Sequence, residues 1–328
     1  MLENWLSPIH SPLVNNYFSD AYSCQGNFPD LSDAKVVVFS RDSNFSSIVR
    51  KSIGQLYRHA DVSFIDIGVL TVDNPSSIYQ VITELHDGYI LPILLGIDYK
   101  CFIEFCSALQ LEDKLHNCAF ISNTIHLSDN AVHYENLGFQ RHIIPKFQFD
   151  ELMVGNEGLS LGHLRSRQYT LEPILRDINY LHFDMASVRR SDCPSSHRSL
   201  PTGLHAAEAC QIMRYAGEGM RLKLVSLDTT DLDDSDEVEA MLVAELLWYL
   251  HEGISVRPIH HPSVADRFKE YIVELNEVDH SLTFAQSTDN GKWWMKIDNA
   301  SNKYVACAYE EYQMSIDEGI PDRLLKFI

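Results

Sequence analysis

The sequence lacks the features that mark several large classes of protein. No apolar run approaches the roughly 20 residues that a membrane-spanning helix needs, so we expect no contact with a membrane interior. The first residues, Met1-Leu-Glu-Asn-Trp-Leu, include an acid and no basic region, which argues against a secretory signal. The 7 cysteines are odd in number and irregularly spaced, so no disulfide framework is expected. These absences predict a cytoplasmic protein with reduced thiols.

Basic charge is also scarce. Lys and Arg number 26 against 46 Asp and Glu, which gives a formal net charge of -20. Such a charge repels nucleic acid and anionic membrane surfaces, so neither is an expected partner. Acidity that keeps the protein soluble explains this composition, and attraction of a cationic ligand is the alternative. No Gly-rich phosphate loop, paired CxxC or nucleophile elbow is present.

Short apolar runs alternate with helical periodicity through most of the chain. Strands are predicted at 35–40, 62–68, 89–96, 117–122, 178–184 and 221–228, and helices near 45–59, 75–85, 101–109, 204–215 and 238–250. This alternation is typical of an α/β protein with a mostly parallel sheet and helices on both faces. The fold class is therefore α/β, a three-layer α/β/α sandwich.

Three regions depart from this pattern. Residues 1–34 form an irregular N-terminal segment, and the stretch from about Asp129 to Gly162 is expected to be rich in loops. The main α/β domain spans 35–255, and 256–328 form a C-terminal appendage packed on it. There we expect a helix from Arg267 to Leu275 and short strands at 282–285 and 292–297. Trp293 and Trp294 should face opposite ways, one into the core and one toward another subunit.

Ligands of open α/β sheets bind beyond the carboxyl ends of the strands, so residues at those ends are the candidates for chemistry. Three segments place polar residues there: Leu91-Pro-Ile-Leu-Leu-Gly-Ile-Asp-Tyr99, Cys118-Ala-Phe-Ile-Ser-Asn-Thr-Ile-His126 and Tyr180-Leu-His-Phe-Asp-Met-Ala-Ser-Val-Arg-Arg-Ser-Asp-Cys-Pro194. With Pro201-Thr-Gly-Leu204 and the helix after it, they resemble the ureohydrolase superfamily of arginases, agmatinases and formimidoylglutamases. The formimidoylglutamase-like branch is the most similar, and an arginase-like fold is implied.

The resemblance implies a pair of manganese ions, but most ligand positions hold other residues. Gly96 and Asp98 match the first motif, whereas Tyr99 stands where the family has a metal-binding histidine. Asp184 keeps the first aspartate of the third motif, and Ala186 replaces the second.

The second motif keeps no complete ligand set in either register. The ligand positions hold Ser122, Thr124 and His126, or Asn123, Ile125 and Leu127. Mn²⁺ prefers carboxylate oxygens with histidine as a partner, so no cofactor is expected unless a site has been rebuilt.

The candidate site residues follow from these motifs. The relic pocket consists of Asp98, Tyr99, Asp184, Asp228 and Asp231, the last two after the strand at 221–228. Asp184 and His126 are the candidate metal ligands, and a rebuilt manganese site would use Asp184, Asp192, Asp228 and Asp231. Arg189 and Arg190 are candidates for binding a substrate carboxylate, with ordinary loop surface as the alternative.

Three functional hypotheses follow. The first is a catalytically degenerate protein with a binding, regulatory or structural role. The second is an active hydrolase of linear amidine C–N bonds, in guanidino or formimino substrates, with a reorganised metal site. The third is an assembly module. The resemblance suggests a homo-oligomer, and a protein partner or a small molecule of unknown identity remains open.

Overall fold

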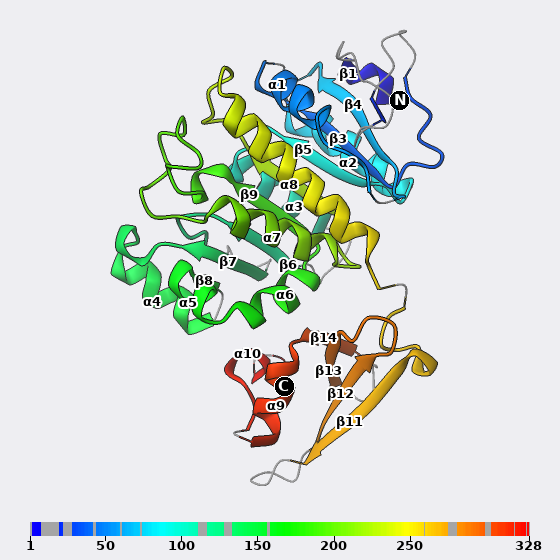
Figure 1. Ribbon diagram of the computed structural model, residues 1–328, viewed down its shortest axis with the longest axis vertical. Coiled ribbons are helices and arrows are strands. Elements are labelled where there is room, and N and C mark those ends of the chain that lie inside the picture. The colour runs from blue at the N-terminus through cyan, green and yellow to red at the C-terminus, as the bar shows by residue number, and fades with distance from the viewer. Residues whose placement is uncertain are drawn as a thin grey trace.

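A computed structural model of the protein describes residues 2–7, 20–21, 28–41, 44–59, 61–72, 74–110, 117–127, 133–155, 158–258, 260–274, 281–298, 303–317, 319–325 and 327. It shows an α/β body joined after its longest helix to a smaller C-terminal unit (Figure 1). No helix in these ranges is long and apolar enough to cross a membrane.

A 10-stranded sheet forms the centre of the body, in the order β1-β4-β3-β5-β10-β9-β6-β7-β8, with β2 also paired to β4. The pairings are parallel except that β1 runs antiparallel to β4. Residues of β3, β5, β9 and β10 are buried throughout, as expected for strands covered on both faces. The predicted α/β class with a mostly parallel sheet is therefore confirmed. The strands are β1 Leu6–Ser7, β2 Asp20–Ala21, β3 Val36–Ser40, β4 Phe64–Leu70, β5 Leu91–Leu95, β6 Asn117–Ile121, β7 His133–Phe139, β8 Gly158–Ser160, β9 Tyr180–Asp184 and β10 Leu224–Asp228.

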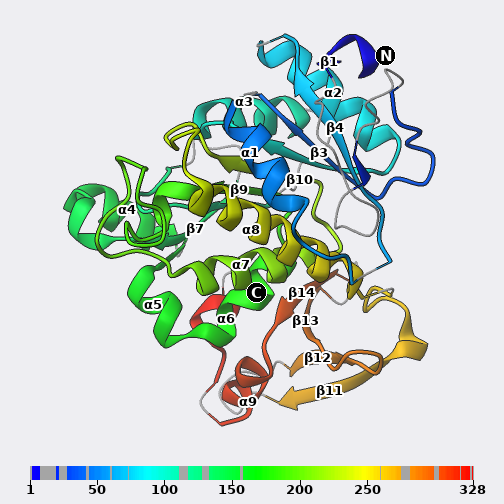
Figure 2. The same cartoon turned by 45° about the horizontal axis from the view of Figure 1, so that its top comes forward.

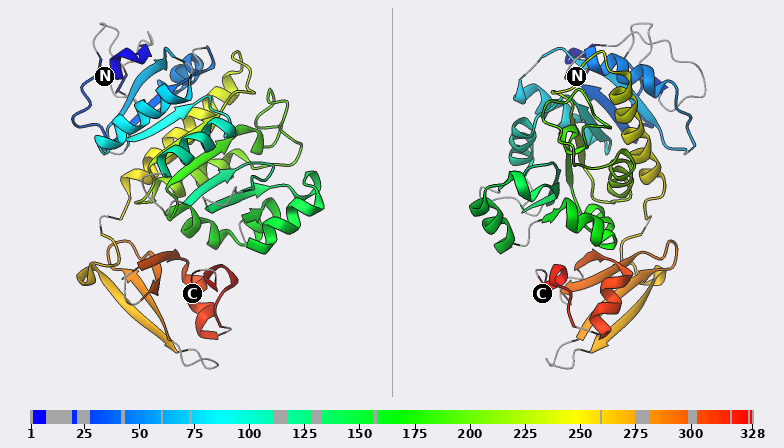
Figure 3. Two further views of the ribbon diagram at one scale, coloured as in Figure 1. Left: turned by 180° about the vertical axis from the view of Figure 1, so that it is seen from behind. Right: turned by 60° about the vertical axis from the view of Figure 1, so that its left-hand side comes forward.

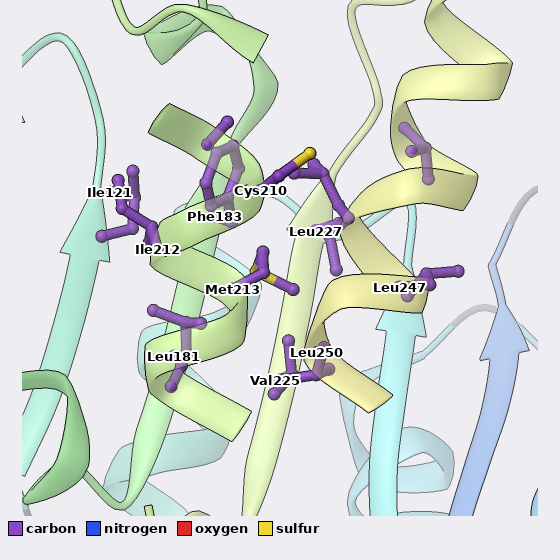
Figure 4. Close-up of a cluster of buried hydrophobic side chains, with 14 of the residues drawn as sticks. Ile121, Leu181, Phe183, Cys210, Ile212, Met213, Val225, Leu227, Leu247 and Leu250 are labelled. Carbon is purple, nitrogen blue, oxygen red and sulfur yellow. The ribbon is translucent and has the colours of Figure 1, made fainter. Parts of the chain in front are cut away.

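Helices cover both faces of this sheet (Figures 1 and 3). One face carries α1 (Asn44–Ile53), α5 (Leu161–Ser166), α6 (Gln168–Arg176), α7 (Ala206–Gly217) and α8 (Glu237–Ser255), and the other carries α2 (Pro75–Asp87) and α3 (Tyr99–Gln110). On the first face, apolar residues of β6, β9 and β10 meet those of α7 and α8 (Figure 4). The two helices touch through glycines, because a Cβ on Gly253 would lie 2.1 Å from the Arg214 carbonyl oxygen.

The segment predicted to be rich in loops is more regular than expected. Its described part contains β7, the 3-10 turn Arg141–Ile143, α4 (Lys146–Gly155) and β8. The strand at β7 was hard to predict because it buries the polar residues Glu135 and Asn136. Asn136 has a specific role, since its side chain accepts from the His126 amide at 2.7 Å and donates to the His126 carbonyl at 3.0 Å. Periodicity of apolar residues cannot reveal a strand whose polar side chains are buried and hydrogen-bonded.

The helix predicted from Arg267 to Leu275 is wrong. A short 3-10 turn, Ala265–Arg267, leads into the strand β11 (Phe268–Glu274), and position 275 lies outside the described residues. β11 pairs with β12 in an unbroken register from Phe268 opposite Ser287 to Glu274 opposite Ser281. This pairing overrides the weak helical period of the segment. The sheet has four antiparallel strands in the order β11-β12-β13-β14, with β12 Ser281–Ser287, β13 Trp293–Asp298 and β14 Lys303–Cys307. Helices α9 (Tyr309–Asp317) and α10 (Asp322–Leu325) follow, and the unit has its own apolar core.

The C-terminal unit contacts the body through α6 and β14, which lie side by side in Figures 1 and 2. The buried Arg176 at the end of α6 donates to the Trp293 carbonyl at 2.9 Å, and its guanidinium carbon lies 4.2 Å from the Trp294 ring centre. The Ala306 amide donates to Asp177 at 2.6 Å. Trp293 and Trp294 do face opposite ways, but both are buried. The second ring packs on Arg176 of the same chain and not on another subunit, because the unit folds back on α6.

Candidate functional site

The candidate site lies where three neighbouring strands end. β6, β9 and β10 are adjacent in the sheet, and Asp228 pairs in register with Asp184. Ser122, just after β6, donates to Asp184 at 3.3 Å. The parallel order of the strands therefore brings Asp184 and Asp228, both predicted from the sequence, to one edge of the sheet.

A guanidinium group lies among these carboxylates. Arg198 donates to Asp184 at 3.1 Å and to Asp228 at 3.2 Å through its two terminal nitrogens. Its Nε lies 3.4 Å from Asp231. One planar cation thus contacts Asp184, Asp228 and Asp231 at once, a geometry to which the fork of an arginine is suited.

The loop that carries Arg198 is fixed in place at several points. The Arg198 amide and the Ser196 hydroxyl both donate to Asp231, at 3.0 and 2.7 Å. Asn123, after β6, donates to the Arg198 carbonyl at 3.0 Å. The Ser195 amide donates at 2.7 Å to Glu239, a fully buried carboxylate of α8. Arg198 is therefore presented by a loop with a defined conformation.

Burial and the neighbouring Arg198 cation shift the pKa of Asp184 in opposite directions. Burial raises the pKa of Asp184 to about 6, even though Arg198 and hydrogen bonds from the Ala186 amide and Ser122 favour the ionised form. The second carboxylate, Asp228, raises that pKa further by like-charge repulsion. For the partly buried Asp231, burial is outweighed by the bonds from Ser196 and Arg198, which hold its pKa below the ordinary value.

The residues of the first motif, and His126 of the second, are engaged in other contacts. Asp98 accepts from the Cys101 amide at 2.9 Å and so caps the start of α3. The Tyr99 ring centre is 4.4 Å from that of His126, which also packs on Phe120 at 4.8 Å. Burial lowers the pKa of His126 to about 4, so this imidazole is neutral at physiological pH. The structure places Asp98, Tyr99 and His126 in capping and packing contacts.

Three further predicted residues make contacts within their own loop and with the start of α7. Arg189 donates to Asp192 at 2.9 Å, and Asp192 also accepts from the Ala206 amide at the start of α7 at 3.0 Å. Arg190 makes a long contact of 3.5 Å to the Ser196 carbonyl. Asp192 therefore does not join Asp184 and Asp228 in the arrangement expected of a rebuilt site.

Sequence reasoning missed Arg198 and Glu239. No local pattern singles out an arginine in an irregular loop, since its partners lie on other strands. A glutamate in the first turn of α8 reads as favourable helix-end charge. Its burial, which depends on the loop above it, is what gives it a positioning role.

The side chains present do not fit a pair of manganese ions. Across the described ranges, no group of three or more His, Cys, Asp or Glu side chains is arranged to hold a metal. The position between Asp184 and Asp228 is taken by the Arg198 guanidinium, and Ala186 offers no ligand. His182 is buried with Nε2 unpartnered within those ranges; its Nδ1 lies 2.8 Å from the Ser226 hydroxyl, and its ring packs on Phe102 at 5.0 Å.

Comparison with known proteins identifies the fold. The sequence matches no protein-family model and no curated protein. Among solved structures, it is similar to formiminoglutamase from Trypanosoma cruzi with Mn²⁺ (TM-score 0.62, 13% identity, 72% of this chain and 97% of that chain). It is also similar to formimidoylglutamase from Bacillus subtilis (0.56, 13%, 76% and 96%) and to the agmatine ureohydrolase of Thermoplasma volcanium (0.53, 13%, 70% and 92%). The protein therefore has the arginase/ureohydrolase fold, as its motifs predicted.

Proposed function

We propose that this protein is a non-hydrolytic, metal-independent variant of the ureohydrolase fold with a binding or structural role. The observation that carries the proposal is the position of Arg198, which supplies one fixed positive charge to Asp184, Asp228 and Asp231. In a metal-dependent hydrolase, divalent ions would neutralise such carboxylates and lower the pKa of a bound water. An arginine supplies the charge without that chemistry, because it has no open coordination position.

The fixed loop strengthens this proposal. A manganese ion could reach Asp184 and Asp228 only if the Arg198 side chain left, and divalent and guanidinium cations repel each other at such range. The bonds of the loop to Asp231, Asn123 and Glu239 hold Arg198 at the site. The raised pKa of Asp184 reduces the charge imbalance only as the pH falls toward about 6, where protonation begins to remove one negative charge from the cluster.

Purified protein, loaded with Mn²⁺ and desalted, tests the proposal through two measurements. Elemental mass spectrometry should find far less than one manganese per chain, and guanidino and formimino compounds should release no urea, ammonia or formamide above the buffer rate. Near-stoichiometric manganese together with turnover would refute the proposal.

A second candidate function rests on the pKa of Asp184, which at about 6 is close to that of a general base. It is a hydrolase of linear amidine bonds with a reorganised site. Under this alternative, Asp184→Asn abolishes turnover while leaving the fold intact by circular dichroism. Turnover that is absent in the wild type, or unchanged in Asp184→Asn, rules out this alternative.

A further inference from the structure

A separate cavity of about 490 Å³ lies between α1, α8 and the start of α7. Its size falls within the range of roughly 300–1,000 Å³ that is typical of small-molecule sites. None of the residues that contact Arg198 lines it, so it is distinct from the strand-end site. Its lining has an apolar wall, three carboxylates and one lysine. The apolar residues include Ile48, Val238, Met241 and Leu242, and the charged residues are Asp192, Glu237, Glu245 and Lys51.

These carboxylates differ in how well they are neutralised. Asp192 is bound by Arg189 and by the Ala206 amide. Glu237 lies 2.8 Å from Lys51 at the rim of the cavity. Within the described residues, Glu245 has neither a hydrogen-bond nor an ion-pair partner, and burial raises its pKa. Glu245 is therefore the carboxylate of this lining that is left to pair with a cation from solution.

The wall beside Glu245 is apolar. Met241 precedes it by one helical turn of α8, and Ile48 of α1 faces the same space. Val238, which also lines the cavity, is 65% exposed. The cavity therefore offers one negative charge beside a hydrophobic surface, and the net charge of -20 attracts cations to it.

We propose that this cavity binds a small amphipathic organic cation of the primary alkylamine class. The ammonium group would pair with Glu245, and the alkyl chain would lie along Ile48 and Met241. The proposal does not depend on the state of Asp184, so it can fail while the proposed function stands, and the reverse also holds.

Isothermal titration of the full-length protein with n-hexylamine is the test, with n-hexanol as the uncharged probe of the same shape. We expect one binding event per chain for the amine. The wild type should bind n-hexanol about tenfold more weakly than the amine. The Glu245→Gln variant should bind the amine about tenfold more weakly than the wild type does, as expected for loss of a charge-assisted hydrogen bond. Met241→Trp, which fills the cavity, should abolish binding, and melting curves of both variants establish that they are folded.

The matched control is Glu104→Gln, which makes the same change in net charge at an exposed position of α3 on the opposite face. It should leave the affinity for the amine unchanged. Equal affinity for hexanol and hexylamine would overturn the assignment of a cation. Binding that survives in both Glu245→Gln and Met241→Trp, or no binding to the wild type, would overturn the assignment of the site.

Discussion

The replacement Arg198→Ala removes the cation from a cluster in which two of three carboxylates are buried. The side chains of Asp184 and Asp228 are only 8% and 4% exposed, whereas that of Arg198 is 45% exposed. Breaking a fully buried pair costs about 3–5 kcal/mol and an exposed one up to about 1 kcal/mol. We therefore expect the free energy of unfolding to fall by about 2–3 kcal/mol at pH 8.

The stability cost of Arg198→Ala should depend on pH, because the charge of Asp184 changes with pH. The pKa of Asp184 is about 6 in the folded protein, whereas an ordinary aspartate has a pKa of 3.8, so the folded state binds more protons than the unfolded state between these values. Stability from this group is present below pH 3.8 and is lost as pH rises through 6, by about 3 kcal/mol in all. Since Arg198 lowers the pKa, its removal moves this loss to higher pH.

Urea denaturation at pH 5 and pH 8 measures the effect. Arg198→Ala should cost about 1 kcal/mol at pH 5, where Asp184 can be protonated, and the larger amount at pH 8. Adding Asp184→Asn should restore much of the loss at pH 8. The control Lys51→Ala, in a pair whose side chains are 67% and 75% exposed, should change stability by less than about 0.5 kcal/mol. An equal cost at both pH values, or no rescue by Asp184→Asn, would refute the reasoning.

Three further predictions concern the packing, the C-terminal unit and the metal. Gly253→Ala should destabilise by about 3 kcal/mol or more in thermal melts, because its Cβ would lie 2.1 Å from the Arg214 carbonyl oxygen. Gly162→Ala, with nothing within 4 Å, should be neutral or up to about 1 kcal/mol stabilising. Arg176→Ala should lower the free energy of unfolding by about 3 kcal/mol and speed amide hydrogen exchange around Trp293. Unchanged exchange would show that this contact does not hold the C-terminal unit on the body. Millimolar Mn²⁺ should leave the melting temperature of the wild type unchanged and stabilise Arg198→Ala by about 1 kcal/mol; a rise in the wild type would contradict the role of Arg198.

The sequence predicts which buried apolar segments form strands better than it predicts the contacts of buried polar side chains. Buried apolar runs such as those ending at Asp184 and Asp228 have few alternatives to a parallel strand, so these two carboxylates were located correctly. β7 was missed because it buries the polar side chains of Glu135 and Asn136, the latter hydrogen-bonded to the backbone of His126, and β11 because strand pairing decides its conformation.

The site itself was only half predictable. The local sequence pattern predicts which residues end each strand. The side chain that lies between those residues, Arg198, comes from a loop whose position the local pattern does not predict. Arg198 reaches Asp228 across 30 residues, and Asn123 reaches Arg198 across 75. Contacts of this kind are determined by the tertiary fold, and no local spacing encodes them.

A crystal structure grown in millimolar MnCl₂, with data collected at the manganese absorption edge, tests the central claim most directly. The account predicts guanidinium density between Asp184 and Asp228 and no anomalous peak there. An anomalous peak bridging the two carboxylates, with the Arg198 side chain turned away, would contradict it.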